Sequence, residues 1–506
     1  MARRLFELPL FLMMAGVMSA LMLVPAGFAL SQQAFEDARA FFYSAILGIV
    51  IVTLVAVARA GRKRRTTGLA QLLALLAGFA LWPLILAVPF YESVRTTSFV
   101  NAYFEMVSSL TTTGATLFDP VRLSEAEHLW RAMVGWIGGL IMWVAAAAIL
   151  APLTLGGFEV TAAAEPGQGT TAPRVAQMDG ADPHKRLQRA SYALVPVYVL
   201  LTGVLWVALV VAGDTPLTAL CHAMSVLATS GISPVGGVEH AQSGFVGELL
   251  VFVFLLFALS RLTFSNDAVN SSRPGLRHDP EFRMGILVVL GVPALLFLRH
   301  WLAAFDVGGE ENLMAALRAL WGSVFTVLSF LSTAGFQSND WEAAQTWSGL
   351  QTPGLILMGL ALVGGGVATT AGGVKLLRVF ALYLNGTREV ERLVHPSSVA
   401  RTGGFSRQIR REGAFVAWIF FMIFAMTLAV VTMGLAAMGV GFEHALVLAI
   451  AALSTTGPLI TAAPETPVAL AQFGTDVKLW LAAAMVLGRL EMLAIIALIT
   501  PDLWRN

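Results

Sequence analysis

Four short segments of this sequence combine threonine and glycine in the same order, each at the end of an apolar stretch. They read LTTTG, LATSG, LSTAG and LSTTG, and their glycines are Gly114, Gly231, Gly335 and Gly457. The shared pattern Leu-x-Thr-x-Gly recurs at intervals of roughly 100–120 residues, which is typical of an internally repeated unit. Small residues that let membrane helices pack closely would explain a single copy. Four copies in register indicate one shared function instead.

Threonine and glycine in such segments suit the binding of a dehydrated monovalent cation. Glycine adopts positive φ, so the chain can turn its carbonyl oxygens toward a common axis. A ring of carbonyls can replace the hydration shell of an ion, and threonine hydroxyls can add ligands or hold the backbone. The cores contain no acidic side chain, which argues against a site built for a divalent ion. The predicted ion-binding residues are Thr112, Thr113, Gly114, Thr229, Ser230, Gly231, Thr333, Ala334, Gly335, Thr455, Thr456 and Gly457.

The composition shows what kind of scaffold must position these segments. The chain has 506 residues, of which 57% are hydrophobic and 12% charged, whereas soluble proteins average about 25% charged residues. Apolar runs long enough to cross a bilayer recur, for example at 73–87, 136–155 and 194–211. The sequence therefore predicts an all-α polytopic membrane protein. Its net charge of +1 gives no sign of a nucleic-acid partner, and its single cysteine excludes an internal disulfide or a cysteine-based metal cluster.

Basic residues cluster between alternate apolar segments, as in ARAGRKRR at 58–65, and predict the topology. Because loops rich in Arg and Lys stay in the cytoplasm, the intervening helices must occur in pairs, with both termini inside. The first apolar segment is too long for a signal peptide and has no evident cleavage site, so we expect a retained helix. Shorter apolar stretches, too short to span, precede the four glycine motifs on the outer side. The predicted spans lie near 7–30, 39–60, 68–92, 128–155, 190–213, 245–265, 283–303, 350–385 (broken), 412–437 and 476–500.

Two further features fall inside predicted spans. The run GGGVATTAGGVK at 364–375 cannot hold an ordinary helix, since each glycine costs about 1 kcal/mol relative to alanine. It lacks the Gly-Lys-Ser/Thr of a phosphate-binding loop, so it is either a simple kink or a functional break, and Lys375 could snorkel to the interface. Arg489 lies near the middle of the last predicted helix, where a charge marks a functional site or a satisfied pair. Glu491, two positions away, cannot share its helix face.

Several longer segments strengthen one interpretation of the four motifs. They are WIGGLIMW at 136–143, DPEFR at 279–283, REVERLVHP at 388–396, GGGVATTAGGVKLLR at 364–378 and LGRLEMLAIIALITPDLWR at 487–505. Together with the glycine motifs, they make the chain from about Asn101 onward resemble Trk-type potassium uptake proteins. These belong to the superfamily that also contains the Ktr and plant HKT transporters. The second and fourth motifs differ from the family's usual residues around glycine.

The resemblance implies a fold and an assembly. Two extra N-terminal transmembrane helices (1–66) would precede four helix–pore loop–helix repeats around a pseudo-fourfold pore. The repeats would occupy 67–160, 186–270, 280–390, with a broken second helix, and 408–506. The resemblance further implies a homodimer surrounded by membrane lipid in the bacterial inner membrane. It also implies a separate cytosolic, TrkA-like regulatory subunit with nucleotide-binding domains, because no such domain follows the last predicted helix. The loops at 156–189, 266–283 and 386–411 would be the docking surface.

The resemblance also implies a function. Glycine in all four motifs goes with potassium as the transported ion, whereas serine in the first goes with sodium. The four glycine motifs would form a selectivity filter. A flexible intramembrane loop below this filter would gate the path of the ion, and an arginine would face the pore. The implied pore and gate residues are Arg489, Gly364, Gly365, Gly366, Gly372, Gly373 and Lys375.

The expected activity is potassium uptake through a gated, channel-like pore, with no bound organic cofactor. A proton- or sodium-coupled symporter is the alternative, but it would call for a titratable carboxylate at mid-membrane, and the filter motifs contain none. A membrane enzyme is the least favoured class, because no His/Asp/Glu metal cluster, Gly-x-Ser-x-Gly motif or paired intramembrane Asp is present. Glu105 and His222, which precede the first two motifs, are expected to cap or pack helices rather than bind ions.

Overall fold

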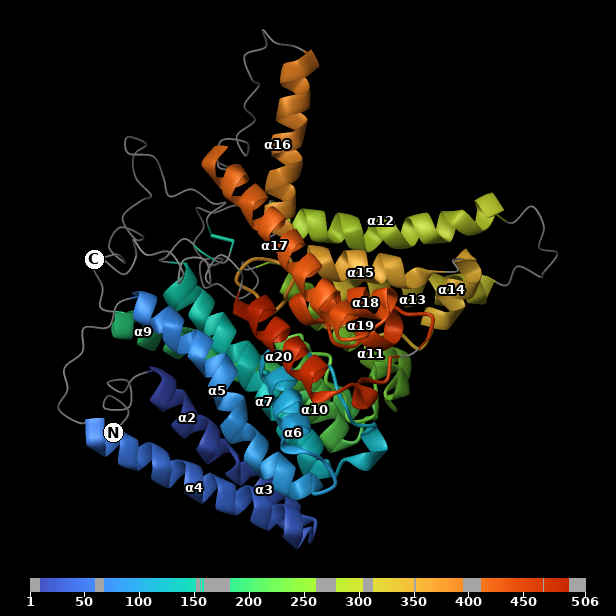
Figure 1. The fold of residues 1–506 in the computed structure, drawn as a ribbon. Helices are drawn as coiled ribbons and strands as arrows, with labels where there is room; N and C mark the ends of the chain where they lie inside the picture. The colour runs from blue at the N-terminus through green and yellow to red at the C-terminus, as the bar shows by residue number, and fades with distance from the viewer. Residues whose placement is uncertain are drawn as a thin grey trace.

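A computed structural model describes residues 10–59, 68–151, 155, 157–158, 183–260, 279–303, 313–349, 352–394, 411–466 and 468–490. Over these residues the chain is helical, with turns and no strand, so the predicted all-α class is confirmed (Figure 1). The helices are α2 (Leu10–Leu21), α3 (Leu23–Ser31), α4 (Phe35–Arg59), α5 (Gly68–Val94), α6 (Phe99–Leu110), α7 (Glu125–Ala145), α9 (Pro183–Val211), α10 (Pro216–Ala228), α11 (Gly244–Leu255), α12 (Pro280–Ala303), α13 (Leu313–Leu331), α14 (Trp341–Ser348), α15 (Pro353–Val363), α16 (Leu376–Val394), α17 (Arg411–Ala437), α18 (Phe442–Leu453), α19 (Leu459–Ala462) and α20 (Thr475–Leu490).

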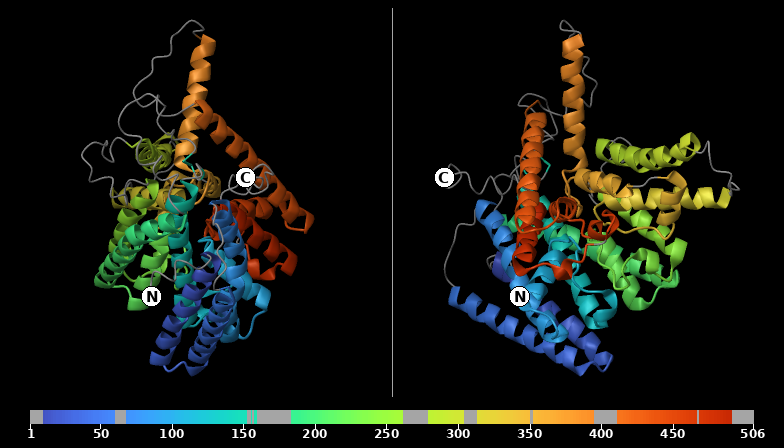
Figure 2. Two further views of the ribbon diagram at one scale, coloured as in Figure 1. Left: turned by 90° about the vertical axis from the view of Figure 1, so that its left-hand side faces the viewer. Right: turned by 45° about the vertical axis from the view of Figure 1, so that its right-hand side comes forward.

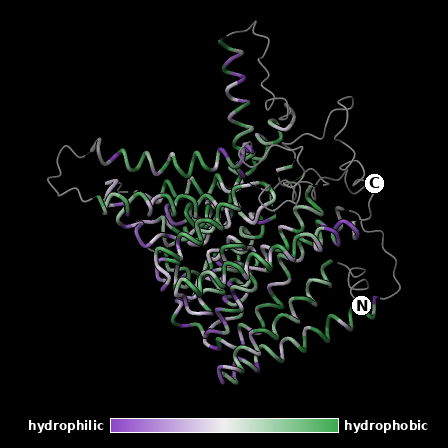
Figure 3. Tube along the Cα trace, turned by 180° about the vertical axis from the view of Figure 1, so that it is seen from behind, coloured by the Kyte–Doolittle hydropathy of each residue, from purple (hydrophilic) through white to green (hydrophobic). Residues whose placement is uncertain are grey.

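Eight of the described helical segments are long and apolar enough to cross a membrane. The longest apolar surfaces face outward: α4, for example, exposes Phe42, Leu47, Ile51 and Leu54. Figure 3 shows hydrophobic residues along most of the helical trace. Such an apolar exterior is stable only in hydrocarbon, where helices also satisfy their own backbone hydrogen bonds. The chain is therefore a multi-span membrane protein.

Four helices, α6, α10, α13 and α18, end at the four glycine motifs and form a closed ring of contacts with their neighbours. Here α7 packs on α10, α11 on α13, α15 on α18, and α20 on α6. The last of these contacts closes the ring, because it joins the C-terminal helices to the first motif's helix. The expectation that each such helix is too short to span is wrong for α13, which runs for 19 residues. Its first turn carries exposed Leu313, Met314 and Leu317, so it extends beyond the buried part.

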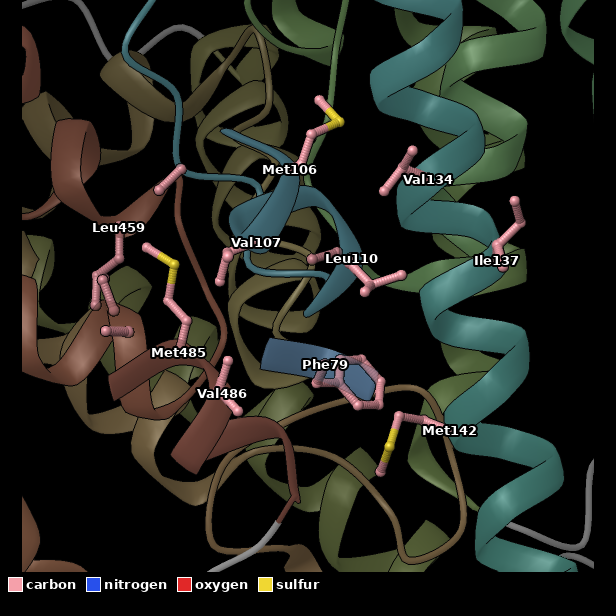
Figure 4. Close-up of a cluster of buried hydrophobic side chains, with 14 of the residues drawn as sticks. Phe79, Met106, Val107, Leu110, Val134, Ile137, Met142, Leu459, Met485 and Val486 are labelled. Atoms are coloured by element: carbon pink, nitrogen blue, oxygen red, sulfur yellow. The ribbon is translucent and has the colours of Figure 1, made fainter. Parts of the chain in front are cut away.

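The N-terminal helices α2, α3 and α4 pack together and rest on α5 and α7 at the edge of this ring. Toward the centre, apolar side chains from α5, α6, α7 and α20 meet around Phe79, Leu110, Val134 and Val486 (Figure 4). On the other side, α12 and α15 lie across the body, and α16 projects away from it (Figures 1 and 2). The four helices that end at the glycine motifs are therefore held from outside by long helices and from within by one continuous core.

The helix predicted as broken at 350–385 is indeed interrupted between α15 and α16. The first predicted span is two consecutive helices, α2 and α3, joined at Met22. The end of α7 widens into a π-helical turn, Ala146–Leu150, and α11 ends in a 3-10 turn, Leu256–Leu259. The last predicted span is described only to Leu490, and both termini and most of the basic loops lie outside the described residues.

Candidate functional site

Four helices, which we call the pore helices, end in the same backbone motif: α6, α10, α13 and α18. The threonine of Leu-x-Thr-x-Gly has a positive φ in every copy: 56° at Thr112, 50° at Thr229, 60° at Thr333 and 54° at Thr455. The N–H of that threonine bonds the carbonyl three residues earlier, and the next N–H bonds the carbonyl five residues earlier, at 2.9–3.3 Å. This pair of bonds is a Schellman motif, which satisfies the last carbonyls of a helix and turns the chain sharply. The four segments are therefore one structure used four times.

A β-branched residue at positive φ is an outlier, because its side chain crowds the backbone there. Such strain costs on the order of 1–3 kcal/mol per residue and persists only where the surroundings impose it. Strained residues of this kind gather at functional sites. The same strain at four equivalent threonines supports a function for these turns beyond ending a helix.

The glycines of the motifs stand where the four loops approach one another. A Cβ on Gly114 would lie 1.9 Å from the carbonyl oxygen of Ser230, and one on Gly231 would lie 2.3 Å from that of Ala334. A Cβ on Gly457 would lie 2.1 Å from the amide nitrogen of Ala115. Gly335 is less crowded, since its nearest neighbour would be the Pro458 side chain at 3.0 Å. The structure thus brings the predicted filter residues together, loop against loop.

The fourth loop departs from the other three. Gly114, Gly231 and Gly335 have positive φ, but Gly457 does not, so the expectation that glycine serves a left-handed turn is wrong there. The N–H of Gly457 instead donates to the carbonyl of Thr113, 2.5 Å away, and ties the fourth loop to the first. Gly457 is required by this close approach of two backbones, which leaves no room for a side chain.

Buried polar side chains hold the outgoing chain after three of the motifs. After the first, Glu105 accepts a hydrogen bond from the N–H of Leu117 at 3.1 Å and pairs with Arg131 at 2.7 Å. After the second, His222 Nε2 lies 2.8 Å from Ser233 Oγ. Glu105 and His222 therefore pack against the loops, as expected. A charge inside a buried segment needs such a partner.

Glu248 of α11 does the same for the third motif, and the sequence interpretation missed it. It accepts bonds from Ser338 Oγ at 2.7 Å, the N–H of Asn339 at 2.7 Å and the indole N–H of Trp321 at 2.8 Å. The signal that could have revealed it is a single carboxylate inside the apolar run GFVGELLVFVFL.

The four threonine hydroxyls fall into two pairs. Thr229 Oγ1 donates to the carbonyl of Ala228 at 2.8 Å and lies 3.2 Å from Thr370 Oγ1, and Thr333 Oγ1 accepts from the N–H of Gly372 at 2.8 Å. Thr112 Oγ1 and Thr455 Oγ1 are buried and have no hydrogen-bond partner among the described residues. The hydroxyls of Thr229 and Thr333 thus contact the segment between α15 and α16. The hydroxyls of Thr112 and Thr455 remain available to a ligand.

The segment between α15 and α16 lies directly against the pore-helix ends. A Cβ on Gly372 would stand 2.1 Å from the carbonyl of Ser454 and 2.4 Å from Thr455 Oγ1. Thr370 Oγ1 donates to the carbonyl of Leu227 at 3.1 Å. We call residues 364–375 the intramembrane loop. Cavities on its two flanks measure only about 20 Å³ each, little more than the space of one water.

Three further buried contacts attach the intramembrane loop to distant parts of the chain. The N–H of Gly366 donates to the carbonyl of Ala258 at 2.9 Å, and the N–H of Val367 donates to the carboxylate of Glu281 at 3.1 Å. The guanidinium of Arg489 donates to the carbonyl of Thr370 at 2.6 Å. The sequence interpretation singled out Arg489, but it quoted Glu281 only within DPEFR and gave it no role of its own; Glu281 lies in the first turn of α12.

The backbone of the intramembrane loop is irregular, and its lysine is buried. Gly364 and Gly373 have φ of 72° and 78°, and Lys375 has 87°. The side chain of Lys375 is 5% exposed, and its ammonium donates to the carbonyl of Ala371. The alternative that Lys375 snorkels to the interface is therefore wrong.

The described residues contain no group of three or more His, Cys, Asp or Glu side chains that could hold a metal. What they do contain is four threonine–glycine loops that meet inside a bundle of membrane helices, with the intramembrane loop packed against them. Irregular backbone at membrane depth is tolerated where it is buried or lines a water-filled path. The fold and the site together define a membrane transport protein.

Comparison with known proteins identifies the group more closely. The TrkH family model, described as "Cation transport protein", matches residues 251–504. The chain is 31% identical to the Trk system potassium uptake protein TrkH of Vibrio parahaemolyticus, over 81% of this chain and 80% of that protein. It is 30% identical to the Trk system potassium uptake protein TrkH of Escherichia coli K12, over 83% of each.

The crystal structure of the potassium transporter TrkH from Vibrio parahaemolyticus superposes with a TM-score of 0.79, at 26% identity, and covers 98% of both chains. The chain belongs to the TrkH family of cation transport proteins. The predicted resemblance and the predicted architecture of two N-terminal helices and four helix–pore loop–helix repeats are both confirmed.

Proposed function

We propose that this protein takes up potassium through a channel-like pore whose selectivity filter is the ring of four Leu-x-Thr-x-Gly loops. One observation carries the proposal: the same strained Schellman turn, with the same left-handed threonine, ends all four pore helices. Relatives that match over four fifths of the chain are named potassium uptake proteins. The ion is the transported substrate, and the filter oxygens replace its water shell.

The filter would select by rigid placement of oxygens. Each loop is bonded to the end of its own pore helix, and the Gly457–Thr113 bond ties the first loop to the fourth. The unpartnered hydroxyls of Thr112 and Thr455 are candidate ligands on the loop-facing side of the ring. A negative cell interior favours inward movement of a cation by about 2.3 kcal/mol per 100 mV.

The intramembrane loop would be the gate, and the conformation described here would be the closed one. The loop lies against three of the four filter threonines, and the flanking cavities leave no passage for an ion. Arg489 adds a positive charge beside it and bonds Thr370, so it disfavours a cation and holds the loop at once. Opening requires these contacts to break.

A coupled symporter is less well supported than a channel-like pore. Proton coupling calls for a carboxylate that can exchange protons along the path. The buried carboxylates of Glu105, Glu248 and Glu281 each accept a backbone N–H, and Glu105 also pairs with Arg131. Each of these carboxylates is thus occupied in holding a loop, and its hydrogen bonds would have to break before it could exchange a proton.

We further propose the assembly that the family resemblance implies: a homodimer in the bacterial inner membrane, with both termini cytoplasmic, that binds a separate nucleotide-binding regulatory subunit. Support comes from the relatives' designation as parts of a Trk system. Support also comes from α16, which projects from the helical body and carries the described part of the loop at 386–411 (Figure 2).

The testing experiment is rubidium and sodium flux into proteoliposomes that contain this chain, for the wild type and Gly114→Ser. We expect the wild type to pass rubidium well above sodium, because the ring fits the larger, dehydrated ion. The added side chain would meet the Ser230 carbonyl, so Gly114→Ser should erode this preference. Gly359→Ser on α15, where a Cβ meets nothing within 4 Å, is the control and should behave as the wild type. Unselective wild-type flux, or an unchanged preference in Gly114→Ser, would place selection elsewhere.

A further inference from the structure

A large apolar cavity lies away from the pore, between α2, α5, α7 and α9. Its volume is about 370 Å³, far above the two cavities beside the intramembrane loop. The lining includes Leu10 and Leu21 of α2, Ile137 and Ile149 of α7, and Leu187 and Val195 of α9. These four helices lie side by side in Figure 1. Neither the filter nor the loop uses this space.

The lining offers water almost nothing to bond. Ser191 contributes a hydroxyl, and Trp136 lines the cavity with an indole whose N–H already bonds Thr202 at 2.9 Å. The other lining residues are aliphatic side chains or methionines. Water needs two to four polar partners to occupy a cavity, so the natural occupant is apolar. Val17, which lines the cavity and is 40% exposed, marks where it reaches the bilayer.

The length and position of the cavity match one leaflet of a membrane. Its wall on α2 runs from Leu10 to Leu21, which is about 16 Å along a helix. Half of a bilayer's hydrocarbon core is about 15 Å. The cavity begins at the end where α2 and α9 start and where α7 finishes, which is the cytoplasmic end in the proposed topology. An extended acyl chain of the inner leaflet has the required length, shape and polarity.

Charge at that end favours an anionic headgroup. Lys185 and Arg189 lie in the first turns of α9, next to the lining residue Leu187, and both are exposed. Long basic side chains at a helix end reach the headgroup region, and each is attracted to an anionic surface. A zwitterionic lipid would fill the cavity equally well but would gain less from these two cations.

The inner half of α7 separates the cavity from the intramembrane loop. Ile141, Ala145 and Ile149 line the cavity, whereas Met142, Ala146 and Leu150 line the small space beside Gly372 and Arg489. This wall contains the π-helical turn Ala146–Leu150, a local widening that often marks a functional position. Whatever fills the cavity therefore supports α7 against the loop.

We propose that this cavity binds an acyl chain of an anionic phospholipid from the cytoplasmic leaflet, and that its occupancy holds α7 against the intramembrane loop. The binding stands on the cavity alone, while the effect on the loop rests on the proposed gating function. Loss of the lipid would loosen the α7 wall and shift the loop equilibrium, so flux would depend on the lipid composition of the vesicle.

The test uses the full chain in vesicles of phosphatidylglycerol or phosphatidylcholine that contain a phospholipid with a photoreactive acyl chain. After illumination, labelled peptides are mapped in the wild type, in Ser191→Phe, which fills the cavity, and in Leu200→Phe, a control on the lipid-exposed face of the same helix. We expect labelling of Leu10–Leu21 and of the inner half of α7 in the wild type and in Leu200→Phe. In Ser191→Phe that labelling should fall by about threefold or more, because the phenyl ring occupies part of the cavity and obstructs the acyl chain. Equal labelling in Ser191→Phe and the wild type would overturn the site.

A second variant tests the headgroup without touching the cavity. The photoreactive phospholipid is used with either a phosphatidylglycerol (anionic) or a phosphatidylcholine (zwitterionic) headgroup. In Lys185→Gln/Arg189→Gln, labelling by the anionic probe should fall to the level given by the zwitterionic probe. If the two probes label the wild type equally, the anionic part of the proposal is wrong. Ion flux is measured on the same vesicles. Reduced labelling with unchanged flux in Ser191→Phe would keep the binding site and overturn its link to the gate. Labelling remains readable even if the chain carried no potassium at all, so failure of the proposed function is distinguishable.

Discussion

The four filter loops and the intramembrane loop look alike in sequence, since both place threonine and glycine among apolar residues, but they are held in different ways. Each filter turn is bonded to the end of the pore helix that precedes it, through carbonyls three and five residues back. The C-terminal end of the intramembrane loop bonds back to Leu362 and Val363 of α15, but the rest of the loop is held by distant residues: Ala258, Glu281, Thr333 and Arg489. Contacts within one helix end persist as long as that helix does. Contacts to remote elements can be exchanged, so one region suits selection and the other suits movement.

The largest expected effect on flux comes from crowding the four filter loops. Gly457→Ala would place a Cβ 2.1 Å from the Ala115 nitrogen and so push the first and fourth loops apart by about 1 Å. We expect potassium flux to fall by about tenfold or more, since the ring no longer fits the ion. Gly335→Ala is the matched comparison, because its Cβ meets only the Pro458 side chain, at 3.0 Å, although its φ is 78°. Rubidium uptake measures both. A larger loss in Gly335→Ala would show that backbone strain, not space, governs the ring.

The next largest effect on flux is expected from loosening the contacts of the intramembrane loop. Arg489→Gln removes the charge and weakens the bond to Thr370, which is 2.6 Å long. A hydrogen bond from a charged group contributes about 1.5–3 kcal/mol, so basal flux should rise by about 10–100-fold. Arg489→Lys keeps the charge but loses the planar guanidinium, and should lie in between. The measurement is uptake by this chain in the absence of any partner. Flux that falls or stays constant in Arg489→Gln would contradict the closed-gate interpretation.

A third pair of variants compares one buried carboxylate from each region. Glu281→Gln weakens the bond to Val367 of the intramembrane loop, so basal flux should rise by about 2–10-fold with potassium-to-sodium preference unchanged. Glu248→Gln weakens three bonds behind the third filter loop, so preference should fall without a rise in flux. Dual measurement of rubidium and sodium uptake separates the two results. The comparison fails if both variants change the same quantity.

The smallest expected effect on flux comes from removing a single threonine hydroxyl at equivalent positions of the motifs. Thr333→Val removes the acceptor for the N–H of Gly372 and should raise basal flux by about 2–5-fold, since a neutral hydrogen bond contributes about 0.5–1 kcal/mol. Thr112→Val is the comparison, because its hydroxyl bonds nothing among the described residues and is a proposed ion ligand. We expect Thr112→Val to lower potassium flux rather than raise it, because it removes a ligand and leaves the contacts of the intramembrane loop intact. Equal increases in the two variants would indicate a general loosening of the filter instead.

The helical membrane scaffold, the four Leu-x-Thr-x-Gly turns and the break before α16 could all be predicted from the sequence. These are local properties: apolar length decides whether a segment crosses the bilayer, and glycine and threonine in a short run decide where a helix stops. The repetition of Leu-x-Thr-x-Gly then indicated that four such stops share one role. Boundaries of α5, α12 and α17 agree with the predicted spans to within a few residues for the same reason.

Which groups meet depends instead on how the helices pack in three dimensions. The tertiary structure placed Gly457 against Thr113 without a positive φ, buried Lys375, extended α13, and joined Glu281 to Val367 across 86 residues of sequence. It also decided that one face of α7 lines an apolar cavity while another supports the intramembrane loop. Contacts of this kind depend on how helices distant in sequence pack in three dimensions, and no local pattern records the identity of a partner across the bundle.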